Sequence, residues 1–249
     1  MNIENSVALV TGANRGLGKA YTDALLAAGA QKVYAGARDP ASVAITDQRL
    51  VPVKLDVAQD KDVRAAAGSC PDVNLLINNA GVMLGCPMLA DGSEAALRAE
   101  MEVKVFGMLR MVRAFAPILA RNGGGAIANM LSVVSWFVFP FNATYCASKH
   151  AALALTEGVR IQLKAQGTQV VAVYAGFIDT DMAAGFDSEK TPPRQVAERT
   201  LDGIRNGLND VHADARAEAI WRAATTDAAG LHAQMQQQWD ERAADDLLA

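Results

Sequence analysis

Short runs of β-branched and other apolar residues alternate along the chain with segments of helical periodicity. This alternation limits the fold more than any other feature, because it is typical of strands joined by crossover helices into a parallel sheet. The predicted strands are 7–11, 32–37, 50–55, 75–78, 125–131, 169–174 and a short last one over 210–213. The predicted helices are 17–28, 60–67, 93–121 and one that Asn142 caps and that ends near Gln166, before Gly167. The sequence therefore predicts an α/β fold.

The 249-residue chain shows no internal repeat, no low-complexity linker and no marked boundary, so we expect a single domain over residues 1–249. Residues 183–193 have the composition of a flexible loop. Apolar residues make up 51% of the chain, enough for a substantial core, and 20% are charged. The net charge of −4 provides no broad basic field, so neither a nucleic acid nor an anionic membrane is expected as a partner.

The N-terminal residues lack the basic and apolar regions of a signal peptide, and no apolar run approaches the roughly 20 residues that span a bilayer. Cys70, Cys86 and Cys146 are odd in number and form no CxxC pair, and the three histidines are scattered. This cysteine usage is typical of a reducing compartment. We therefore expect a cytoplasmic protein without a metal site.

A glycine-rich turn, residues 11–18, joins the first predicted strand to the first predicted helix. Glycines let the backbone approach a phosphate closely, and the helix N-terminus offers it free N–H groups. A P-loop is excluded, because five residues separate Gly12 from Gly18 instead of four and Ala20 replaces the Ser or Thr that binds magnesium. The turn predicts a dinucleotide site.

Tyr145 and Lys149 are four residues apart and share one face of a predicted helix. An ammonium group beside a phenol favours the phenolate, so this spacing suggests a tyrosine with a lowered pKa that can exchange protons near neutral pH. The alternative is a pair of solvated side chains.

The glycine turn, the run 78–81 (Asn-Asn-Ala-Gly), Ser132 and the Tyr145–Lys149 pair occur in a fixed order. In this the chain resembles the short-chain dehydrogenase/reductase superfamily in its compact, single-domain form, over roughly residues 5 to 182. The resemblance implies a Rossmann-like, doubly wound parallel sheet with helices on both faces. It also implies Ser132, Tyr145 and Lys149 as catalytic residues, with Ser135 as the alternative to Ser132.

The resemblance further implies a set of residues that bind a nicotinamide dinucleotide. They are Gly12, Asn14, Arg15, Gly16, Leu17, Gly18, Arg38, Asp56, Val57, Asn79, Ala80, Gly81, Tyr145, Lys149, Gly176, Ile178 and Thr180.

The end of the second strand predicts which nicotinamide dinucleotide binds. An acidic residue there would accept hydrogen bonds from the 2′-hydroxyl of NAD, but Ala37 occupies the place and Arg38 follows it. Arg38 and Arg15 can pair with the 2′-phosphate of NADP. Asp39 is the counter-argument, although it can simply begin a turn with Pro40. We expect NADP(H).

Two positions depart from the pattern of the superfamily. Lys104 stands where its members usually have an asparagine that bends a helix and holds a water linked to the active-site lysine. Three interpretations are open. Lys104 is partly neutral and still holds that water, its side chain points elsewhere, or the proton relay is impaired. Ala175 replaces the proline of a Pro-Gly pair and frees the chain beside the nicotinamide.

The expected reaction is the NADPH-dependent reduction of a ketone or aldehyde to an alcohol. The segments that would border the substrate are rich in apolar residues, which favours an apolar or aromatic small molecule. These residues are Met83, Leu84, Met88, Trp136, Phe137, Phe139, Phe141, Phe177 and Phe186. The alternatives are a 3-oxoacyl thioester reductase and a non-catalytic NADP sensor. The superfamily implies a homodimer or a homotetramer.

Overall fold

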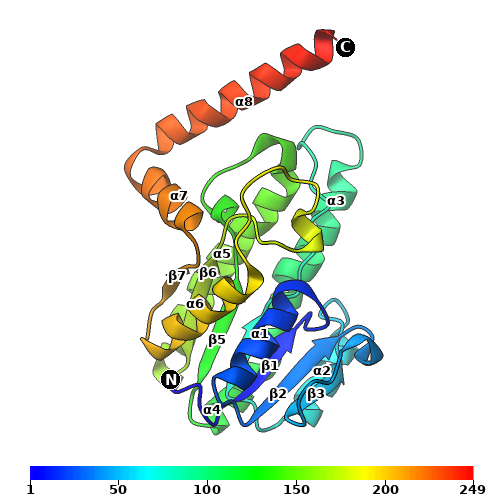
Figure 1. Cartoon of the computed structure of the whole chain (residues 1–249), viewed down its shortest axis with the longest axis vertical. Coiled ribbons are helices and arrows are strands. Elements are labelled where there is room, and N and C mark those ends of the chain that lie inside the picture. Colours follow the sequence, from blue (N-terminus) through cyan, green and yellow to red (C-terminus); the bar gives the residue numbers. More distant parts are fainter. Residues whose placement is uncertain (249) are drawn as a thin grey trace.

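The computed structural model describes residues 1–248 and contains one seven-stranded sheet (Figure 1). The strand order is β3-β2-β1-β4-β5-β6-β7, and every neighbouring pair is parallel. The strands are β1 (Val7–Thr11), β2 (Lys32–Ala37), β3 (Leu50–Lys54), β4 (Leu75–Asn78), β5 (Ala126–Met130), β6 (Gln169–Tyr174) and β7 (Asp210–His212). The predicted doubly wound α/β fold is confirmed.

Helices cover both faces of the sheet (Figure 1). They are α1 (Gly16–Ala27), α2 (Asp60–Ser69), α3 (Ser93–Met101), α4 (Met108–Arg121), α5 (Ala143–Leu163), α6 (Pro193–Arg205), α7 (Ala215–Thr226) and α8 (Ala228–Leu248). α1 and α6 pack on one face, while α2, α4 and α5 pack on the other. Because both faces are covered, strands β1 and β4 are buried at every residue, as apolar parallel strands usually are.

The predicted helix 93–121 is interrupted. Residues Glu102–Gly107 form a π-helical turn, η2, between α3 and α4. Such turns insert one extra residue per turn and rotate the side chains that follow, and they are frequent at functional sites. Lys104 lies within η2 and is buried, with 3% of its surface exposed.

The sequence predicted the C-terminal end of α5 correctly but not the N-terminal cap. At the C-terminal end, α5 continues into a 3₁₀ turn, Lys164–Gln166, and Gly167 ends that turn with a φ of +77°. Asn142 precedes the helix, but its side chain does not cap it. Instead, Asn142 Nδ2 donates to Met83 Sδ at 3.2 Å, because the loop after β4 lies against this end of the helix. The prediction of an Asn142 cap was therefore wrong.

The C-terminal helices lie beyond the last strand. α7 packs beside β7, and α8 runs away from the sheet, held mainly by α7 and by the turn Pro140–Asn142 (Figure 1). Within residues 1–248, no helix combines the length and the apolar character that crossing a membrane would require.

Candidate active site

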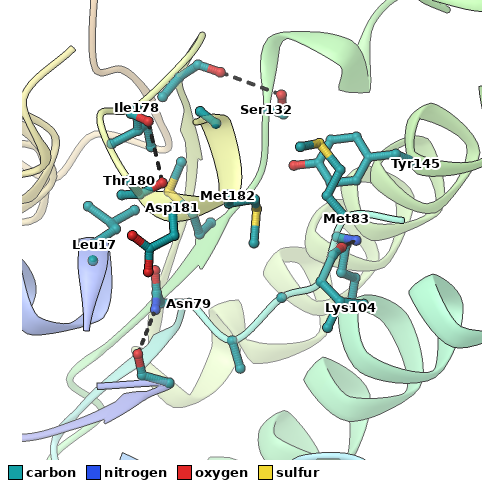
Figure 2. Close-up of a pocket in the computed structure, with 18 of the residues that line it drawn as sticks. Leu17, Asn79, Met83, Lys104, Ser132, Tyr145, Ile178, Thr180, Asp181 and Met182 are labelled. Atoms are coloured by element: carbon teal, nitrogen blue, oxygen red, sulfur yellow. Dashed lines mark hydrogen bonds between the residues drawn. The ribbon is translucent and has the colours of Figure 1, made fainter. Parts of the chain in front are cut away.

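A cavity of about 890 Å³ opens at the carboxyl ends of the central strands. The strand order reverses between β1 and β4, and open α/β sheets bind ligands at that point. All the residues predicted to bind the cofactor or to act in catalysis line this one cavity, and Figure 2 shows part of it. They are Gly12, Asn14, Arg15, Gly16, Leu17, Gly18, Arg38, Asp56, Val57, Asn79, Ala80, Gly81, Ser132, Tyr145, Lys149, Gly176, Ile178 and Thr180.

The glycine turn forms a cradle that side chains would fill. Gly12 and Gly16 have φ angles of +66° and +53°, which favour glycine. A Cβ atom on Gly18 would lie 2.0 Å from the Gly12 carbonyl oxygen. No side chain caps the N-terminus of α1, so its first N–H groups are available to a phosphate. The cradle fits the pyrophosphate of a dinucleotide.

A hydrogen-bond network holds this turn against β4. Asn79 Nδ2 donates to the carbonyl oxygen of Thr11 at 2.9 Å. Thr11 Oγ1 in turn accepts from the backbone N–H groups of Asn79 and Ala80, both at 2.9 Å. The Asn-Asn-Ala-Gly run therefore fixes the floor of the cavity by hydrogen bonds to the turn.

Two charged residues after β2, Arg38 and Asp39, line the cavity. Arg38 is exposed and lines the cavity. The carboxylate of Asp39 accepts from the backbone N–H of Ala41 at 3.0 Å, so Asp39 begins a turn with Pro40. Arg15 pairs with Asp181 across the cavity at 2.6 Å, and both side chains are largely exposed.

Ser132 and Tyr145 both line the cavity and lie near each other (Figure 2). Ser132 Oγ lies 3.5 Å from the carbonyl oxygen of Ala175, and Ser132 N donates to Ser135 Oγ at 3.3 Å. Ser135 thus supports the turn that carries Ser132. Lys149 Nζ donates to the carbonyl oxygen of Met130 at 2.8 Å and lies 5.7 Å from the centre of the Tyr145 ring.

Burial is the main cause of the pKa shifts of Tyr145 and Lys149. It raises the pKa of Tyr145, the charges of Cys146 and Glu100 add to the rise, and Ser132 opposes it. Burial also lowers the pKa of Lys149 well below its usual value, and the neighbouring charge of Lys104 lowers it further. The sequence suggested that Lys149 would lower the pKa of Tyr145. Burial outweighs that effect, so the phenol holds its proton at neutral pH.

Lys104 points into the site. Its Nζ donates to the carbonyl oxygen of Val82 and lies 4.3 Å from the centre of the Tyr145 ring. Burial lowers the pKa of Lys104 to about 8, and Glu100 opposes this shift. Glu100 is fully buried, and sequence reasoning missed it. Glu100 and Lys104 are four residues apart in one predicted helix, and this spacing could have indicated that the two side chains are neighbours.

Aromatic residues form the outer part of the cavity, but four of the nine apolar residues predicted to border the substrate do not line it. Phe137, Phe139, Phe177, Phe186 and Met83 line it. By contrast, the Trp136 ring stacks on Tyr174 with centroids 4.0 Å apart, and the Phe141 ring stacks on Trp239 at 5.2 Å. Leu84 and Met88 are exposed and do not line the cavity.

Two further residues of this outer part come from the C-terminal helices. Arg216 lies over the Phe177 ring, 4.8 Å from its centre, and Gln238 lies at the rim. No sequence pattern signalled either residue, because their helices reach the cavity only through the fold.

Comparisons with known proteins agree with this geometry. A profile described as short chain dehydrogenase matches residues 6–191. A short chain dehydrogenase of Monascus purpureus is 31% identical over 196 residues, which cover 72% of this chain and 67% of the relative. Human 17-beta-hydroxysteroid dehydrogenase type 1 is 32% identical over 209 residues, which cover 78% of this chain and 62% of the human protein.

A solved structure is also similar over nearly the whole chain. It is a short chain dehydrogenase from Burkholderia cenocepacia J2315 in complex with NADP, 42% identical, with a TM-score of 0.91. The match covers 94% of this chain and 99% of that one. The chain therefore belongs to the short-chain dehydrogenase family and is an NAD(P)-dependent oxidoreductase.

Proposed function

We propose that the protein reduces a ketone or aldehyde to an alcohol with NADPH, on an apolar or aromatic small molecule. The observation that carries the proposal is the Tyr145 hydroxyl, which points into the cavity that the glycine cradle opens (Figure 2). A phenol whose pKa is raised holds its proton at neutral pH and can donate it to a substrate oxygen.

Each catalytic side chain has a separate task in this reaction. When bound, the nicotinamide supplies the hydride. Ser132 holds the carbonyl oxygen by a hydrogen bond, and Tyr145 transfers its proton to that oxygen as charge develops there. Lys149 holds the ribose beside the nicotinamide. Phe137, Phe139, Phe177 and Phe186 exclude water from the reacting atoms and favour an apolar substrate.

The preference for NADPH rests on the end of β2. Ala37 provides no carboxylate for a ribose 2′-hydroxyl, and one oxygen of the Asp39 carboxylate accepts from Ala41 N–H in a turn. Arg38 lines the cavity there and offers a planar guanidinium to a 2′-phosphate. Arg15 is a weaker candidate for the same phosphate, because it pairs with Asp181. The complex of the Burkholderia cenocepacia relative with NADP supports this choice.

We also propose that the whole chain acts as one domain, with residues 183–193 as the substrate loop, in a homodimer or homotetramer located in the cytoplasm. The Ile178–Thr191 bridge closes the base of that loop, and Phe186 from it lines the cavity.

Exposed apolar side chains beside the long helices favour self-association, with Ile161 on α5 76% exposed and Phe106 in η2 47% exposed. The three cysteines are free, which fits a reducing compartment.

The test mixes the protein with NADPH or NADH and a panel of ketones, aldehydes and acyl thioesters, and follows cofactor absorbance. We expect NADPH oxidation with apolar or aromatic ketones, and a loss of about a thousandfold in kcat for Tyr145→Phe with unchanged NADPH affinity. Arg38→Asp should weaken NADPH binding at least about tenfold, while the control Arg64→Asp on α2 should not. Turnover of thioesters alone, or wild-type turnover in Tyr145→Phe, would contradict the proposal.

A further inference from the structure

A buried pair of opposite charges lies behind the proton donor. Glu100 on α3 and Lys104 in η2 are four residues apart, and their exposed fractions are 0% and 3%. Buried charges are costly unless other groups compensate them, so a pair in this place calls for a function. Neither residue takes part in the reaction steps given above.

Both side chains hold the same loop, residues 82–85, which follows β4 and includes Met83 of the cavity wall. Lys104 Nζ donates to the carbonyl oxygen of Val82. Glu100 Oε1 accepts from the backbone N–H groups of Leu84 at 2.9 Å and Gly85 at 3.1 Å. Among the described residues, the second oxygen of Glu100 has no hydrogen-bond partner. One oxygen of the carboxylate therefore holds the loop, while the negative charge of the carboxylate acts on Lys104.

The same lysine contacts the proton donor. Its Nζ lies 4.3 Å from the centre of the Tyr145 ring, closer than the 5.7 Å of Lys149 Nζ (Figure 2). An ammonium over an aromatic ring is attracted by the negative face of the ring, and more strongly when water is excluded. The π turn makes this contact possible, because it re-aims the side chains of η2 relative to those of α3.

The titratable groups around Lys104 come from two elements. Glu100 faces it from α3, and Tyr145, Cys146 and Lys149 lie on α5. When Tyr145 gives up its proton, a phenolate forms between two lysines. A protonated Lys104 stabilises that phenolate, and Glu100 keeps Lys104 protonated.

We propose that Lys104, balanced by Glu100, is a positioning residue that supports Tyr145 and favours the tyrosinate formed on proton donation. The proposal rests on the reductase function proposed above. It assigns the site two lysines that act on one tyrosine, and it makes the rate of reduction depend on the protonation of Lys104.

The pH dependence follows from the contacts. Lys104 loses its proton as pH rises through about 8, so the rate of reduction should fall on that alkaline side. In Glu100→Gln the amide oxygen can still accept from Leu84 and Gly85, but the negative charge is gone, so the fall should move to lower pH. In Lys104→Met the group that titrates near pH 8 is absent, so the fall at that pH should disappear.

The experiment measures kcat from about pH 6 to 10 for wild type, Lys104→Met, Lys104→Arg and Glu100→Gln, with exposed Lys164→Met as the control. We expect Lys104→Met to lower kcat at least about tenfold at neutral pH, with NADPH affinity unchanged and without a fall in kcat near pH 8. Lys104→Arg should restore part of the rate. Glu100→Gln should shift the alkaline fall in kcat to lower pH by roughly half a pH unit or more. A kcat within about twofold of wild type in Lys104→Met, or an unmoved pH profile in both variants, would overturn the proposal.

A second measurement does not depend on turnover. The cofactor-free protein labelled with ¹³C at lysine Cε should show an NMR signal that titrates near pH 8, absent in Lys104→Met and displaced to lower pH in Glu100→Gln. If no carbonyl compound is reduced while this titration is present, the proposed function fails and the charge pair stands. If Lys104→Met does not fold, Glu100→Gln alone decides. A Lys104 signal that titrates with an ordinary pKa would refute the inference.

Discussion

At the scale of one residue, Gly18 shows that the shape of the cavity depends on a position without a side chain. Its backbone packs so closely on the Gly12 carbonyl and on Asn79 Nδ2 that a Cβ atom would lie 2.0 Å and 2.8 Å from them. The first of these neighbours is backbone, and Asn79 is itself held by Thr11, so neither can move away cheaply. The position of α1, and with it the phosphate cradle, depends on this contact.

Gly18→Ala should therefore displace the glycine turn from the N-terminus of α1. We expect NADPH affinity to fall at least about tenfold and stability to fall by roughly 1–3 kcal/mol, the usual cost of overpacking. Gly158→Ala on α5 is the matched control, because nothing lies within 4 Å of an added Cβ there. It should leave binding unchanged and stabilise the helix by roughly 0.5–1 kcal/mol. Fluorescence titration with NADPH and thermal melts measure both, and equal effects of the two substitutions would contradict this view.

At the scale of elements, the sequence predicted the strands better than the side chains around the site. β1, β2, β4 and β6 have the predicted bounds, because strands buried on both faces need apolar runs. The π turn could not be predicted, since helical periodicity hardly changes when one residue is inserted. The loss of the Asn142 cap and the role of Glu100 depend on the loop 82–85, which lies far from both in the chain.

Helix α8 is the element whose contribution the sequence did not predict. Trp239 stacks on Phe141, and Arg242 lies over the same ring, 4.7 Å from its centre. These contacts hold Gln238 at the rim of the cavity. Since Phe141 lies in the turn that precedes α5, α8 also braces the helix that carries Tyr145.

Trp239→Ala should loosen α8 without disturbing the cradle. We expect the KM for the carbonyl substrate to rise at least about threefold, while NADPH affinity stays the same, because an aromatic pair contributes about 0.5–1.5 kcal/mol. Trp221→Ala on α7 serves as the control, since Trp221 packs on His212 away from the cavity. Steady-state kinetics with the substrate found in the panel provide the measurement. An unchanged KM, or a loss of NADPH binding, would show that α8 does not have this role.

For the whole molecule, the buried lysines couple folding to pH. The native state lowers the pKa of Lys104 from 10.5 to about 8 and lowers that of Lys149 as well. Between about pH 8 and 10 the unfolded chain therefore binds more protons than the native protein, so these two groups make stability rise with pH. Cys70 and Cys146 act in the opposite direction above about pH 9, because burial raises the pKa of each thiol to about 11.

A comparison of wild type with Lys104→Met measures the contribution of Lys104, including its effect on the pKa of Lys149. From about pH 7 to 9, the free energy of unfolding of the cofactor-free wild type should rise relative to that of the variant, by roughly 1 kcal/mol. Urea denaturation at several pH values measures the difference. A difference that stays constant with pH would show that Lys104 keeps an ordinary pKa in the native state.

The reversal of strand order between β1 and β4 has a last consequence. The cradle comes from the first part of the chain, whereas Ser132, Tyr145 and Lys149 come from segments that follow β4. A dinucleotide that spans both parts binds only where the two halves of the sheet have joined. Bound ligand should therefore slow amide hydrogen exchange across the β1–β4 junction, even in strands that the ligand does not touch.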